Sequence, residues 1–224
     1  MDSKPTNKKK SLIGSVVAVI AFIVAFIVVK EFKSIWYESQ SFKEASVSVT
    51  SEVEKEIQSA KSQATPEKST TEILIEESQK KINSTLDNSA TKKKKLVAAS
   101  NMFFGAYFLN TRTRPEYCSK LGVNISEFVN EYKKVHHSLF VSAEKLQIMD
   151  FKENGRTYNI DKFYSLLSPA GRKVIAQVMK DTAAYLKTNE IGACQSFAQH
   201  PAEWAKEADL SKRAPELTQL LLSY

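Results

Sequence analysis

The chain has 224 residues and a formal net charge of +7 at neutral pH, which leaves room for one domain of ordinary size and one further segment. The basic excess lies at the two ends, since residues 1–11 carry +3, residues 30–91 carry −3 and residues 92–224 carry +7. Basic side chains do not alternate with aromatic ones, which argues against a nucleic-acid platform. No Walker loop, dinucleotide glycine pattern or nucleophile elbow occurs, so the sequence indicates no cofactor and no catalytic residue.

The first predicted element is a transmembrane helix at residues 12–29. These eighteen residues include no charged side chain and span about 27 Å as a helix, close to the hydrocarbon thickness of a bilayer. The run is longer than the apolar core of a cleaved signal peptide and lacks a small-residue cleavage site, so we expect an uncleaved signal anchor. The lysine-rich tail at residues 1–11 is expected in the cytoplasm, with the rest of the chain across the inner membrane in the periplasm.

Residues 30–91 are expected to form a stalk or linker. No aromatic side chain occurs between Lys43 and Met102, and a segment without large apolar side chains does not fold as a globule. Apolar residues recur at steps of three and four from Phe42 to Ala64 before Pro66 interrupts them, which predicts a helical stripe. Two interpretations stay open, a coiled coil that makes a homodimer and a single solvated or partly disordered tether.

Residues 92–224 are expected to form an extracytoplasmic all-α domain, because they hold 16 of the 22 aromatic side chains and no convincing strand pattern. The run from Leu96 to Leu109 is apolar on most sides and too short to cross a membrane, so it predicts the central helix. An amphipathic helix is predicted over 126–150. Ser168 and Pro169 predict the start of another helix. We expect a bundle of about five to seven helices with short connections.

Lys92, Lys93, Lys94 and Lys95 form a basic run directly before the predicted central helix. Such a run is typical of a solvated helix start. It is also a candidate contact for acidic lipid or for a partner.

Cys118 and Cys194 are the chain's two cysteines. In an oxidising compartment they are expected to form a disulfide, whereas in the cytoplasm two buried free thiols are expected. The bond would close a loop of about 77 residues, for which the chain-entropy model gives roughly 4.5 kcal/mol of stabilisation.

The histidines do not predict a metal site. His136 and His137 are adjacent, and adjacent residues on a helix point about 100° apart, so the pair cannot converge on one ion. His136 falls on the apolar side of its helix, where a hydrogen-bonded core histidine is expected. Three Ser-x-x-Lys matches occur without the companion motifs of penicillin-recognising enzymes, and we assign them no role.

One anchor, a stalk and a helical disulfide-linked head together resemble the layout of many envelope proteins of Gram-negative bacteria. By that likeness of layout alone, the head is expected to be a protein–protein or envelope-polymer interaction module without enzymatic activity. Two alternatives stay open. One is a sensor or regulatory subunit that works through another membrane protein, and the other is an envelope enzyme with a dispersed acidic and arginine site.

Overall fold

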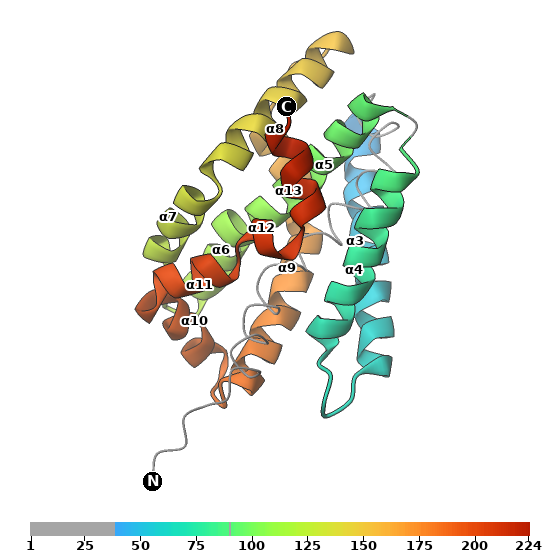
Figure 1. The fold of residues 1–224 in the computed structure, drawn as a ribbon. Helices are drawn as coiled ribbons and strands as arrows, with labels where there is room; N and C mark the ends of the chain where they lie inside the picture. The colour runs from blue at the N-terminus through green and yellow to red at the C-terminus, as the bar shows by residue number, and fades with distance from the viewer. Residues whose placement is uncertain (1–38, 90) are drawn as a thin grey trace.

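The computed structural model describes residues 39–89 and 91–224, which form helices joined by short turns (Figure 1). The predicted all-α helical bundle is confirmed for this part of the chain. Its elements in chain order are α3 (Ser39–Gln63), α4 (Thr70–Asp87), α5 (Lys92–Phe108), the π-helix η1 (Leu109–Thr113), α6 (Arg114–Lys120), α7 (Ser126–Val135), α8 (His137–Glu153), α9 (Ile160–Tyr185), α10 (Glu190–Gln199), α11 (Pro201–Glu207), α12 (Leu210–Arg213) and α13 (Pro215–Leu222).

Helix α5 is the central helix that the apolar run predicts. From Ala98 to Phe108 every side chain is buried, and the helix packs against α4, α8 and α13. Its two polar residues in this stretch are hydrogen-bonded across to α8. Ser100 Oγ donates to the Ala143 carbonyl oxygen at 2.8 Å, and the Gln147 amide donates to Asn101 Oδ1 at 2.7 Å. Burial of this helix is therefore compatible with its polar side chains.

Helices α3 and α4 pack on the bundle, although the sequence suggested a stalk apart from it. The apolar stripe of α3 is buried against α9 and joins the same hydrophobic core as α5. The helical periodicity is confirmed, and apolar residues from the range expected to be a stalk, 30–91, belong to the same hydrophobic core as those of 92–224. The buried stripe consists of Ala45, Val49, Val53, Ile57 and Ala60.

The start of α4 is fixed to α9 by a carboxylate. Ser69 and Glu72 form a capping box at the first turn of α4, and one oxygen of Asp181 accepts hydrogen bonds from the Thr71 backbone N–H at 2.9 Å and from the Thr71 hydroxyl. The other oxygen accepts from the Gln177 amide at 2.9 Å. An acidic group at a helix N-terminus is also favoured by the helix dipole. Helix α4 is thus held in place by a partner more than one hundred residues later in the sequence.

Helix α9 runs without interruption through Pro169, so the predicted helix start at Ser168–Pro169 is wrong. A proline inside a helix removes one backbone hydrogen bond and normally bends or breaks the helix. Here side-chain hydroxyls donate to carbonyl oxygens in the turn before the proline. Ser168 Oγ donates to the Ser165 carbonyl at 3.4 Å, and Ser46 Oγ of α3 donates to the Leu166 carbonyl at 3.2 Å. Packing against α3 therefore compensates part of what the proline costs.

The helix predicted over 126–150 is two helices, α7 and α8, which meet at His136. The turn at Asn154–Gly155 separates α8 from α9, and Gly155 has a φ of 65° that favours glycine. Within the described ranges, no helix combines the length and the apolar character that crossing a bilayer requires. The predicted tail at residues 1–11 and the predicted transmembrane helix at 12–29 lie outside the described residues.

Two valines of α3 provide a direct test of this packing. Val53 is 0% exposed and faces the core, whereas Val47 is 63% exposed on the same helix. We predict that Val53→Asp lowers the free energy of unfolding by about 3 kcal/mol or more, because it places a charge in an apolar contact. Val47→Asp should change it by no more than about 0.5 kcal/mol.

Thermal unfolding of the full chain in detergent, followed by circular dichroism, provides the measurement. If α3 were a solvated stalk, the two variants would unfold at the same temperature as the unsubstituted protein.

Candidate functional site

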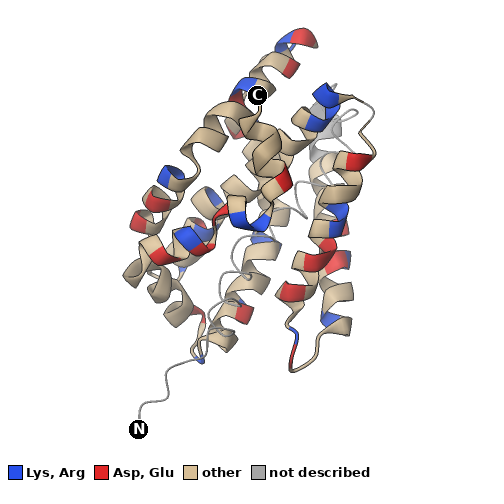
Figure 2. Ribbon diagram, in the orientation of Figure 1, with Lys and Arg blue, Asp and Glu red and all other residues tan. Residues whose placement is uncertain are grey.

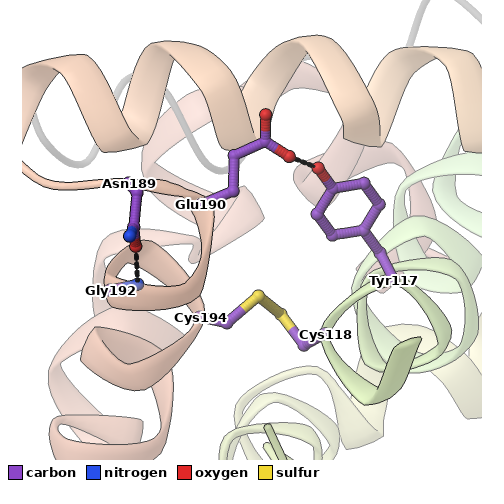
Figure 3. Close-up of a disulfide and its surroundings, with 6 residues drawn as sticks. All are labelled: Tyr117, Cys118, Asn189, Glu190, Gly192 and Cys194. Atoms are coloured by element: carbon purple, nitrogen blue, oxygen red, sulfur yellow. Dashed lines mark hydrogen bonds between the residues drawn. A yellow bond between two sulfur atoms is a disulfide. The ribbon is translucent and has the colours of Figure 1, made fainter. Parts of the chain in front are cut away.

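A disulfide joins α6 to α10, as the sequence predicts for an oxidising compartment. Cys118 and Cys194 are bonded to each other, and both residues are 0% exposed (Figure 3). Because the bond is enclosed by protein, a reductant reaches it only after local opening. Cys118 lies inside α6 and not in a loop connection, since the chain passes from α5 through η1 into α6.

The start of α10 is held tightly beside this disulfide. Asn189 caps the helix by accepting a hydrogen bond from the Gly192 backbone N–H at 2.9 Å, and the Tyr117 hydroxyl of α6 donates to the Glu190 carboxylate (Figure 3). A side chain at position 192 would collide with Thr188, whose hydroxyl oxygen would lie 2.0 Å from the added Cβ. Gly192 therefore permits the close turn that brings Cys194 to Cys118.

Arg114 is the largest fully buried side chain among the described residues. Its guanidinium lies over the ring of Phe197 at 4.7 Å and over that of Phe128 at 5.6 Å, and it donates a hydrogen bond to Asn110 Oδ1. Burial lowers the pKa of Arg114 to about 10, so the group still carries its charge at neutral pH. With 1% exposure, Arg114 does not reach a ligand in solvent; it joins η1 and α6 to α7 and α10 through cation–π contacts.

The π-helix η1 positions this buried arginine. The chain continues helically from α5 through η1, with Pro115 in the first turn of α6. Asn110 donates to the Ala106 carbonyl at 3.0 Å and accepts from Arg114 one turn later. Burial also raises the pKa of the neighbouring Tyr132 hydroxyl, which therefore stays protonated. Sequence reasoning missed this cluster, and the four-residue spacing of the asparagine and the arginine was the one signal for it.

His136 is the core histidine that its position predicts. It is 0% exposed, and its Nε2 accepts a hydrogen bond from the Leu210 backbone N–H at 3.1 Å. Its Nδ1 therefore carries the proton and donates to the Tyr132 carbonyl at 2.8 Å. Burial lowers the pKa of His136, against smaller opposing effects of the Tyr132 carbonyl and Asp209. Both nitrogens are occupied, so this imidazole is not open to a metal ion.

The lysine run occupies the start of α5. Lys92, Lys93 and Lys94 are exposed and Lys95 is half-buried, and Thr91 caps the helix through the Lys94 backbone N–H. Lys93 forms an ion pair with Glu153 at the end of α8. The run is therefore a solvated helix start.

A surface hollow of about 420 Å³ lies between α7 and the start of α11. Its lining mixes two acidic and two basic side chains, of which Lys134 and Glu131 are ion-paired at 2.6 Å. His200, next to the lining residue Pro201, pairs with Glu203 at 2.9 Å. Over residues 39–89 and 91–224, no group of three or more His, Cys, Asp or Glu side chains is arranged to hold a metal ion. Apart from Pro201, every residue that lines the hollow has a polar or charged side chain.

We predict that breaking the Cys118–Cys194 bond lowers the free energy of unfolding by about 4.5 kcal/mol, the loop-closure value for a crosslink of this length. The double variant Cys118→Ala with Cys194→Ala and the reduced protein should unfold at the same lowered temperature. After thiol blocking, the unsubstituted protein should migrate differently on gels with and without reductant. Identical migration would show that the two thiols are free.

The buried His136 makes stability depend on pH. Its folded pKa lies below the ordinary value of 6.5, so the unfolded chain takes up a proton near that pH and the folded chain does not. The free energy of unfolding should therefore be highest above about pH 6.5 and fall as the pH drops towards the folded pKa, with a limiting slope of about 1.4 kcal/mol per pH unit.

Thermal unfolding from about pH 8 to about pH 5 measures this slope. His136→Gln should be less stable at high pH but show a flatter dependence, whereas the surface variant His200→Gln should keep the slope of the unsubstituted protein. An unchanged slope in His136→Gln would assign the acid sensitivity to other groups.

Comparisons with known protein families, with curated proteins and with solved structures found no match to this chain. A helical bundle by itself hosts many unrelated functions. The function must therefore be inferred from the positions of the chain's own residues.

Proposed function

We propose that this protein is a single-pass inner-membrane protein whose helical domain lies in the periplasm and acts as a protein–protein or envelope-polymer interaction module. Residues 12–29 form the anchor and residues 1–11 remain in the cytoplasm. The anchor raises the local concentration of the domain near its partner, so that even a weak contact suffices. The buried Cys118–Cys194 bond is the single observation that carries the proposal.

The disulfide supports the placement of the domain outside the cytoplasm. Disulfides persist in oxidising compartments such as the bacterial periplasm and are rare in the reducing cytoplasm. The two cysteines lie in separate helices, and both are enclosed. A buried structural disulfide together with an uncharged segment of eighteen residues favours an anchored domain on the oxidising side.

Exposed apolar side chains support an interaction role. Val141 and Ile148 are each 49% exposed and lie seven residues apart, on one face of α8. Leu222 is 55% exposed and Tyr224 is 41% exposed at the end of the chain, and the Tyr224 hydroxyl donates to Met149 Sδ on α8 at 3.1 Å. A group of apolar side chains at the surface of a folded domain is a feature of protein-binding faces. An enzyme would instead need a concave site with convergent titratable groups.

Protease added to spheroplasts with a sealed inner membrane tests the placement. We predict that the domain is degraded in intact spheroplasts, because it faces the medium, and that a cytoplasmic marker survives. Protection of the domain until detergent is added would place it in the cytoplasm and overturn the proposal.

The same cells test the interaction role through a photo-crosslinking residue. Placed at Ile148, it should give a discrete product of higher mass, whereas placed at the exposed Lys80 of α4 it should not. Equal patterns of crosslinked products from both positions would show that the α8 face is not the binding surface.

A further inference from the structure

One end of the domain carries a cluster of basic side chains that we call the basic end. It comprises the start of α5, the end of α8 and the turn after α8 (Figure 2). An ion pair between Lys93 and Glu153 joins α5 to α8 there. Six basic residues lie in the segments 87–95 and 150–156, against three acidic ones. Lys92, Lys93, Lys94 and Lys152 are exposed. The basic residues are Lys92, Lys93, Lys94, Lys95, Lys152 and Arg156.

The basic end lies where the described chain begins. Helices α3 and α4 are antiparallel neighbours, and Glu56 and Lys81 form an ion pair between them. The C-terminal end of α4 is therefore at the same end of this pair as the N-terminus of α3, and α5 starts only five residues after α4 ends (Figure 1). The lysines of α5 and the first residue of α3 accordingly share one end of the domain.

The chain length places this end close to the anchor. Nine residues, 30–38, separate the predicted anchor at 12–29 from Ser39, and fully extended they reach about 30 Å at most. Because α3 belongs to the bundle, no long stalk holds the domain away from the lipid. The first residue of α3 therefore stays within about 30 Å of the anchor. The opposite end of the α3–α4 pair lies one helix length farther along α3.

We propose that the basic end of the domain binds the anionic headgroups of the bilayer that anchors the chain. This inference rests on the proposed function, since it requires residues 12–29 to be in that bilayer. Each lysine near an anionic membrane surface adds roughly fivefold to the affinity at moderate salt. The lysines also lie at the N-terminus of α5, which is the positive end of its helix dipole, so their charges are repelled there. A negatively charged membrane surface offsets this repulsion.

The full chain in lipid nanodiscs tests the proposal. Discs of phosphatidylcholine alone are compared with discs that also contain phosphatidylglycerol, and the rate of acetylation of each lysine is followed by mass spectrometry. In the anionic discs, Lys92 and Lys94 should react at least about threefold more slowly than in the neutral discs. Lys61 and Lys180, at the opposite end, should react equally in both. High salt should remove the difference, because it shortens the screening length.

A pair of variants separates the lysine contact from the anchor. Lys92→Gln with Lys94→Gln should abolish the lipid-dependent protection of Lys93, Lys95 and Lys152, whereas the matched variant Lys61→Gln with Lys180→Gln should leave it intact. Both variants should keep the circular dichroism spectrum and the non-reducing gel mobility of the unsubstituted protein.

The outcomes are distinguishable. A chain that fractionates with the discs but reacts equally at Lys92 in both lipids overturns the lipid contact and leaves the proposed function standing. A chain that does not fractionate with the discs overturns both.

Discussion

Burial of one apolar stripe of α3 against α9 is the contact on which the arrangement of the whole domain depends. It is formed by small and β-branched side chains around Val49 and Val53, which let the two helices approach closely. The contact covers part of α9, supports that helix through Pro169 by the Ser46 hydrogen bond, and leaves α4 in position for the cap by Asp181. With α3 in the core, the domain begins close to the segment proposed as its anchor.

The opposite side of α9 is held by a different set of interactions. The disulfide fixes α10 to α6, and the buried guanidinium of Arg114 joins the same region through the rings of Phe128 and Phe197. His136 connects the break between α7 and α8 to the start of α12. These groups are enclosed, which suits a rigid scaffold. The accessible chemistry of the domain lies instead on its surface, in the basic end and in the exposed apolar residues of α8.

Local patterns in the sequence predict which segments are helical better than they predict what those helices contact. The periodicity of α3 and the apolar character of α5 were sufficient for both helices, and Cys118 and Cys194 were correctly paired because only one intramolecular pairing exists. The partner of the α3 stripe could not be read from periodicity, since the same stripe fits another copy of the chain or α9 of its own. The continuity of α9 through Pro169 could not be predicted from the proline, since hydroxyls of Ser168 in the same turn and of Ser46 in α3 donate to the carbonyl oxygens before it. The burial of Arg114 could not be predicted from the sequence, because it depends on aromatic rings that α7 and α10 supply.

Hydrogen exchange of the full chain in nanodiscs measures whether α3 is part of the folded domain. Burial and packing against α9 predict that backbone amides from Val49 to Ala60 exchange about as slowly as those from Val174 to Thr182 in α9, and that both groups open together as denaturant is added. Rapid exchange throughout α3, with α9 still protected, would show that α3 is a free stalk and not part of the folded domain.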